Sequence, residues 1–182
     1  RYPAVVFVHG AGRGSRSALI DQAEYLASVG VVALVYDKRT VGYSFANRDF
    51  DLLAEDALAA VRVLRERADV DPDRVGLWGV SEGGWVVPIA AARSSDVAFA
   101  ILVSAPNVSP QSQAAWAFDD HLRRMGAPAG LRRAMLLALS MGEFNYSRHD
   151  PVPSLANLRQ PVLALYGTHD RAIPVLQSAR VL

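Results

Sequence analysis

The sequence contains no cysteine among its 182 residues, which excludes disulfides, thiolate metal sites and a thiol nucleophile. An excess of either charge is also lacking, because 19 basic and 18 acidic residues leave a formal net charge of +1. Nucleic-acid-binding domains usually carry a basic stripe, whereas the arginines here are scattered. No apolar run reaches the roughly 18 residues that a membrane span needs. We therefore expect a globular protein without a nucleic acid or a membrane as partner.

The length and composition suit one domain with a substantial core, since 51% of the residues are hydrophobic and 20% are charged. The sequence starts at Arg1 rather than at a methionine and ends within a helix-like pattern. We expect it to be a segment of a longer protein, cut at both ends. The compartment stays open, with a slight preference for the cytoplasm, because any signal peptide would lie upstream.

Short apolar runs alternate with segments of helical periodicity along the chain. The runs are rich in β-branched residues, as is typical of strands buried on both faces of a parallel sheet. They cover residues 4–9, 31–36, 74–78, 99–103 and 162–166. The helical segments cover residues 17–29, 51–68 and 82–93. This alternation predicts an α/β fold with a mostly parallel sheet.

The alternation stops between residues 107 and 159, where two amphipathic helices are predicted over 111–125 and 131–141. We interpret 107–159 as a helical cap insertion in a core formed by 1–106 and 160–182. Ligands of such sheets bind beyond the carboxyl ends of the strands, so we expect the insertion to cover that edge. Its large apolar residues could line an acyl pocket, although ordinary helix packing is favoured: Trp116, Phe118, Leu122, Met125, Met135, Leu136 and Met141.

One motif in the sequence indicates a catalytic residue. Residues 79–83 read Gly-Val-Ser-Glu-Gly, a G-x-S-x-G that follows a predicted strand and opens a predicted helix. The turn is so sharp that glycine is needed two positions either side of Ser81, and the helix N-terminus there favours an oxyanion. Ser81 is therefore the candidate nucleophile. The alternative is a glycine-rich turn that merely packs the helix against the sheet.

Four segments in this order resemble the α/β-hydrolase superfamily, and within it small bacterial serine esterases with a helical cap: VVFVHGAG, YDKRTVGYS, GVSEGG and PVLALYGTHDRAIP. The resemblance implies an oxyanion hole formed by the backbone N–H groups of Glu82 and Ala11, with Gly12 as the alternative to Ala11. The Glu82 carboxylate would benefit from its place at a helix N-terminus. Asp37 and Arg39 resemble the family's loop brace.

The resemblance also implies an acid and a base. Asp170 stands where the family carries the acid that orients the histidine, although it could instead cap the turn before Pro174. The family's histidine follows the acid, but none of the four histidines does so. His9 is expected to make structural hydrogen bonds, His169 to point away, and His121 and His149 to lie on the surface. We expect the base beyond Leu182, so the segment alone should be inactive.

The prediction is a serine hydrolase that cleaves a small-molecule carboxylic ester, or another acyl substrate, through an acyl-enzyme. An aminopeptidase or amidase on the same fold remains the alternative enzyme, because the Ser81 motif does not distinguish ester from amide. A non-catalytic binding protein of this fold is the alternative outside enzymes. No cofactor or metal is predicted: the glycine-rich residues 10–14 lack the lysine of a phosphate-binding loop. The oligomeric state is left open.

Overall fold

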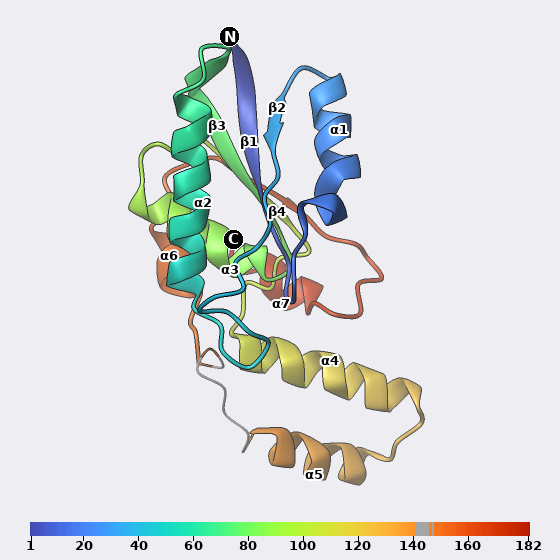
Figure 1. Cartoon of the computed structure of the whole chain (residues 1–182). Helices are drawn as coiled ribbons and strands as arrows, with labels where there is room; N and C mark the ends of the chain where they lie inside the picture. Colours follow the sequence, from blue (N-terminus) through green and yellow to red (C-terminus); the bar gives the residue numbers. More distant parts are fainter. Residues whose placement is uncertain (141–145, 147) are drawn as a thin grey trace.

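A computed structural model describes residues 1–140, 146 and 148–182. Within them the five strands form one sheet with the order β2-β1-β3-β4-β5, and every neighbouring pair is parallel (Figure 1). The strands are β1 (Tyr2–Val8), β2 (Val32–Leu34), β3 (Val70–Val80), β4 (Ala100–Val103) and β5 (Val162–Leu165). The predicted α/β fold with a mostly parallel sheet is confirmed.

The helices follow the predicted periodicity with shifted ends. They are α1 (Ile20–Ser28), α2 (Phe50–Arg65), α3 (Gly83–Arg93), α4 (Pro110–Arg124), α5 (Ala129–Ser140), α6 (Val152–Ala156) and α7 (Val175–Ala179). A 3-10 turn, Arg16–Leu19, precedes α1 where one continuous helix was predicted. The five-residue helix α6 was not predicted, because so short a helix shows too little apolar periodicity. The helix-like pattern at the end of the sequence corresponds to α7, which ends at Ala179.

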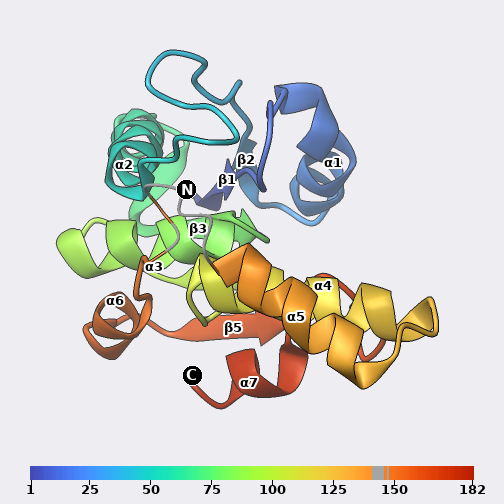
Figure 2. The ribbon, with the colours of Figure 1, turned by 90° about the horizontal axis from the view of Figure 1, so that it is seen from below.

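Helices cover both faces of the sheet. Helix α1 lies on one face, and α2, α3 and α6 lie on the other (Figure 2). Strand β1 shows the consequence: Ala4, Val6 and Val8 pack with α2 and α3, whereas Val5 and Phe7 pack with α1. Since successive strand residues point to opposite faces, a strand between two helical layers must be apolar throughout. This is why the strand signal was a continuous apolar run.

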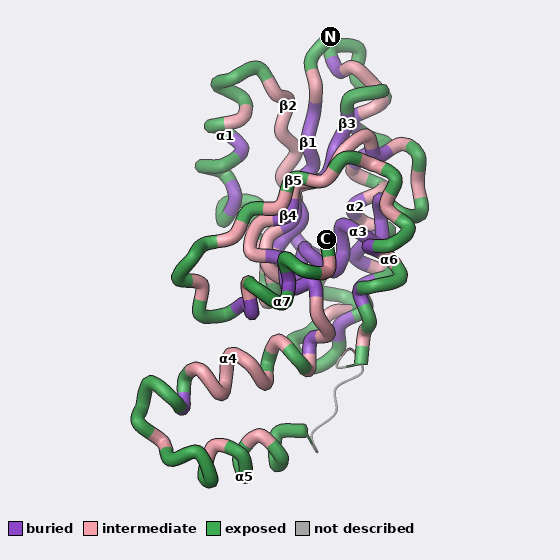
Figure 3. Tube along the Cα trace, turned by 180° about the vertical axis from the view of Figure 1, so that it is seen from behind, coloured by how far each residue is buried: buried purple, intermediate pink, exposed green. Residues whose placement is uncertain are grey.

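Helices α4 and α5 form a hairpin beyond the carboxyl ends of the strands (Figure 1). Gly126 joins them with a φ of 77°, a left-handed conformation that glycine adopts without strain. Helix α5 has no buried residue, and most of the hairpin is exposed or half-buried (Figure 3). No helix in the described part of the chain is long and apolar enough to cross a membrane.

Candidate active site

Ser81 occupies a tight turn between β3, which ends at Val80, and α3, which begins at Gly83. Its φ of 51° lies in the left-handed region, a strained backbone for a serine and typical of functional sites. The glycines two positions either side of Ser81 are required by space: a Cβ on Gly79 would lie 2.6 Å from the Gly83 carbonyl oxygen, and one on Gly83 would lie 2.8 Å from the Val8 carbonyl oxygen. The predicted need for glycine around Ser81 is therefore confirmed.

Gly79→Ala is expected to lower the free energy of unfolding by about 3 kcal/mol, because backbone atoms on both sides of the turn must move to admit the methyl group. The contact at 2.6 Å is with a carbonyl oxygen rather than with a flexible side chain. Denaturant unfolding of the variant measures the loss. Gly130→Ala in α5 is the control, since its added Cβ would meet no described atom within 4 Å apart from its chain neighbours and the backbone of its own helix. Equal stability of both variants would contradict the steric explanation.

The loop after β1 lies directly against the Ser81 turn. A Cβ on Gly10 would be 3.6 Å from the Ser81 Cβ. The Gly12 N–H donates to the Tyr43 hydroxyl over 3.1 Å. The N–H groups of Ala11 and Glu82, in contrast, have no acceptor among the described residues. The loop after β1 and the Ser81 turn therefore each hold a backbone donor without an acceptor among the described residues, whereas the Gly12 N–H is engaged.

Asp170 lies in the turn after β5, and one carboxylate oxygen already serves that turn. Its Oδ1 accepts the N–H groups of Ala172 and Ile173 over 2.9 and 3.1 Å. Its Oδ2 makes no hydrogen bond with the part of the chain that the structure describes. The capping function considered as an alternative is thus present, and it engages only one of the two carboxylate oxygens. Asp170 also lines a hollow of about 270 Å³ that includes Trp116.

The histidines differ from one another in their surroundings. His9 Nε2 hydrogen-bonds the Tyr36 carbonyl over 2.5 Å, which is the structural bond expected; burial lowers the pKa of His9. The prediction that His149 lies freely on the surface is wrong, because its ring packs edge-on against Phe50 with centroids 5.0 Å apart. The sequence did not reveal this contact between His149 and Phe50. His121 and His169 are exposed.

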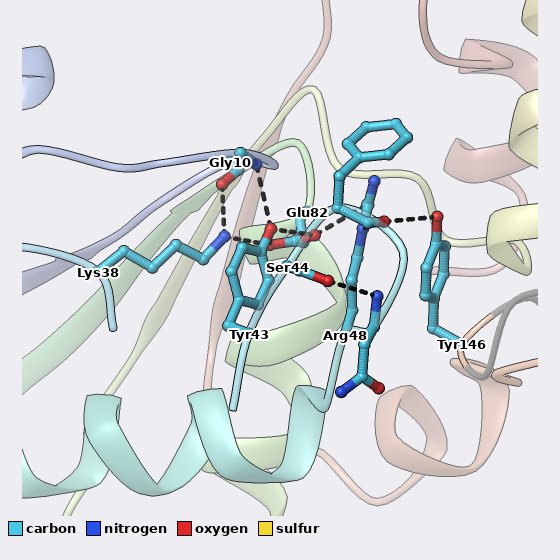
Figure 4. A network of polar contacts seen from close by, with 10 residues as sticks. Gly10, Lys38, Tyr43, Ser44, Arg48, Glu82 and Tyr146 are labelled. Atoms are coloured by element: carbon cyan, nitrogen blue, oxygen red, sulfur yellow. Dashed lines mark hydrogen bonds and ion pairs between the residues drawn. The ribbon is translucent and has the colours of Figure 1, made fainter. Parts of the chain in front are cut away.

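The main feature that the sequence did not reveal is a buried ionic cluster around Glu82, which is 1% exposed. Its carboxylate does not cap α3. It forms an ion pair with Lys38 and accepts a hydrogen bond from Arg48 Nη1 over 2.9 Å. Its two oxygens also lie 2.9 and 3.1 Å from the Tyr43 hydroxyl, which donates to them (Figure 4). Burial lowers the pKa of Lys38 and raises the pKa of Tyr43 to about 12. Lys38 is the only lysine in the sequence, and this was the one feature of the composition that could have drawn attention to the cluster.

The two residues expected to form a loop brace have separate partners. Asp37 accepts three hydrogen bonds from Arg16, which lower the pKa of its carboxyl to about 2. Arg39 pairs with Asp56 of α2 over 2.5 Å. Both bonds tie the loop after β2 to its neighbours. The loop therefore holds Lys38, which lies between these two residues, in a fixed place.

A cavity of about 260 Å³ lies between the α4–α5 hairpin and the start of α3. Trp85 and Phe45 line it, together with Leu136 of α5. The Trp85 indole N–H donates to the Val108 carbonyl over 2.9 Å and so ties α3 to the segment before α4. Among the large apolar residues singled out in the insertion that the structure describes, only Leu136 lines this cavity. Leu122 is buried, Met125 is 71% exposed, and Met141 lies outside the described residues.

A parallel sheet covered by helices on both faces, with a strained serine on the turn from a central strand to a helix, defines the α/β-hydrolase fold. Comparison with known proteins agrees. The model of the prolyl oligopeptidase family matches residues 21–182. The chain therefore belongs to the prolyl oligopeptidase family. Among solved structures, that of DcsB in complex with its substrate analogue superposes with a TM-score of 0.73 at 19% identity, over the whole of this chain and 77% of DcsB.

Two relatives are more similar in sequence. Esterase EstD of Thermotoga maritima is 28% identical over 93% of this chain. A puromycin-hydrolyzing peptidase of Mycobacterium tuberculosis is 28% identical with a TM-score of 0.66, over 99% of this chain. The chain spans about half of the length of EstD, 47%, and 27% of the length of the peptidase. By their names these two relatives are hydrolases, one an esterase and the other a peptidase.

Proposed function

We propose that this chain carries the nucleophile and the oxyanion hole of a serine hydrolase that cleaves carboxylic esters. The observation that carries the proposal is Ser81, held at a φ of 51° beside the unpaired N–H groups of Ala11 and Glu82. Donors already aimed at the developing oxyanion need no reorganisation during the reaction. The likeness to EstD favours an ester as the substrate.

The reaction would begin with attack of the Ser81 Oγ on the ester carbonyl while a general base takes the hydroxyl proton. The carbonyl oxygen becomes an oxyanion that the Ala11 and Glu82 N–H groups stabilise. The C–O bond then breaks, the protonated base gives its proton to the leaving alcohol, and an acyl-enzyme on Ser81 remains. Water, deprotonated by the same base, releases the acid. Asp170 Oδ2 would orient the base.

We propose that the base is a histidine outside these 182 residues. No histidine follows Asp170 in the sequence, and His9 is engaged with Tyr36. A triad without its base keeps only the residual catalysis of the oxyanion hole and of binding. The 182-residue segment on its own should therefore turn over substrate poorly, if at all.

Residues 107–159 would act as the cap. The cavity of about 260 Å³ beneath α4 and α5 gives room for a small or medium apolar group of the substrate. The second candidate function is hydrolysis of an amide or peptide bond by the same residues, which the likeness to the puromycin-hydrolyzing peptidase favours. A binding protein that uses the same cavity without catalysis is the remaining alternative.

Labelling with a fluorophosphonate tests the proposal, because this probe reacts with an activated serine. The protein as its source produces it is expected to gain a single adduct, mapped by peptide mass spectrometry to Ser81. The isolated 182-residue segment should label far more slowly. Absence of an adduct on the folded source protein would favour the binding protein. Equal labelling of both would contradict a base outside the segment. Panels of esters and amides then distinguish the two enzymes.

A further inference from the structure

The peptide unit between Gly10 and Ala11 has one polar end paired and the other unpaired. Its carbonyl, on Gly10, accepts the Lys38 ammonium over 2.8 Å (Figure 4). Its N–H, on Ala11, has no acceptor among the described residues and lies in the loop against Ser81. A cation on the carbonyl end of a peptide draws electrons toward the oxygen, and chains of hydrogen bonds strengthen one another in this way. The Ala11 N–H therefore becomes a stronger donor.

The same ammonium pairs with Glu82, whose own N–H is the other unpaired donor. Lys38 thus joins the two halves of the oxyanion site, Ala11 and Glu82, which are 71 positions apart in the chain. Tyr43 makes a second link between the same two loops, since its hydroxyl accepts a hydrogen bond from the Gly12 N–H over 3.1 Å and donates one to the Glu82 carboxylate over 2.9 Å. The peptide units on both sides of Ala11 are therefore fixed to one carboxylate.

The cluster lies at a depth where charges are costly. Both Lys38 and Arg48 contact the carboxylate of Glu82, and the side chains of Lys38 and Glu82 are 3% and 0% exposed. A buried pair costs desolvation and adds little to stability by itself, so a function other than stability is the better explanation for this one.

We propose that Lys38 is a positioning residue for catalysis, which holds and polarises the Gly10–Ala11 peptide so that the Ala11 N–H stabilises the oxyanion. The inference rests on the proposed function, because it needs Ser81 to form an oxyanion. Lys38 touches no substrate and acts through the peptide and through Glu82. Its contribution falls on the transition state, where the negative charge is largest, rather than on substrate binding.

Lys38→Met in the source protein is the test, since methionine keeps most of the stem and leaves Glu82 balanced by Arg48. Removal of a complete oxyanion donor costs about 10² to 10³ in kcat; a weakened donor is expected to cost about 10- to 100-fold, with KM nearly unchanged. The infrared stretch of the acyl-enzyme carbonyl should rise, because a weaker hydrogen bond leaves the C=O bond stiffer. Arg39→Met is the matched control, as Arg39 is the next residue and pairs with Asp56 instead.

The outcomes separate this inference from the proposed function. A wild-type protein without a fluorophosphonate adduct on Ser81 would overturn the proposed function. Wild-type labelling at Ser81, together with wild-type kcat and carbonyl frequency in a folded Lys38→Met variant, would overturn the inference alone. Equal losses in Lys38→Met and Arg39→Met, with equally lowered unfolding temperatures, would also overturn it, because both would then act through the stability of the loop.

Discussion

Ser81→Ala is expected to lower kcat of the source protein for its ester by about 10⁶-fold, the size of the loss when the nucleophile of a catalytic triad is removed. Without the hydroxyl no acyl-enzyme forms, and the intact oxyanion site and cavity leave only residual hydrolysis. Stability should change little, because alanine bears the φ of 51° no worse than serine does. Steady-state kinetics and unfolding of the two proteins measure both quantities.

Ser104→Ala provides the control for this variant. Ser104 is the other non-glycine residue of the described chain with a positive φ, 46°, and it follows β4 as Ser81 follows β3. Its replacement should leave kcat within a few-fold of the wild type. Turnover that survives Ser81→Ala would contradict the proposed nucleophile. Substrate affinity that survives it, in a protein without any turnover, would instead favour a binding protein.

Asp170→Asn is expected to lower kcat by about 10⁴-fold while the protein remains stable. The corresponding change in a serine protease leaves the geometry intact but favours the wrong histidine tautomer. Stability should persist because the asparagine carbonyl oxygen can still accept the N–H groups of Ala172 and Ile173, as Oδ1 does at 2.9 and 3.1 Å. Asp170→Ala loses this cap as well and should cost about 1 kcal/mol of unfolding free energy in addition.

The two substitutions at Asp170 separate its two functions. If Asp170→Asn keeps wild-type kcat and Asp170→Ala loses stability only, Asp170 caps the turn and the acid lies elsewhere. If both lose kcat to the same extent and only the alanine variant is destabilised, the carboxylate has both functions. Thermal unfolding is followed together with kcat for this reason.

The sequence predicted the fold well because the signals of this fold are local. A strand buried on both faces must be apolar at each position, and residues 4–8 show this directly. The Ser81 turn was recognisable because its motif is a run of five adjacent residues, in which Gly79 meets Gly83 four positions later. The predicted ends of helices and strands were less accurate, and α6 was not predicted, because five residues hold too little periodicity. The surface placement of His149 failed because Phe50 lies 99 positions earlier in the chain.

By itself, the sequence determined the α/β architecture, the serine at the strand–helix turn and the candidate donors around it. The first two follow from patterns within short segments, and the candidate donors follow from the resemblance to the α/β-hydrolase superfamily. Only the tertiary structure decided which N–H groups are unpaired and what the Glu82 carboxylate does. Lys38 lies 44 positions from Glu82 and 28 from Gly10, and Arg48 lies 34 from Glu82. Parallel strands bring their carboxyl ends to one edge, so residues from separate loops meet there and form one buried cluster.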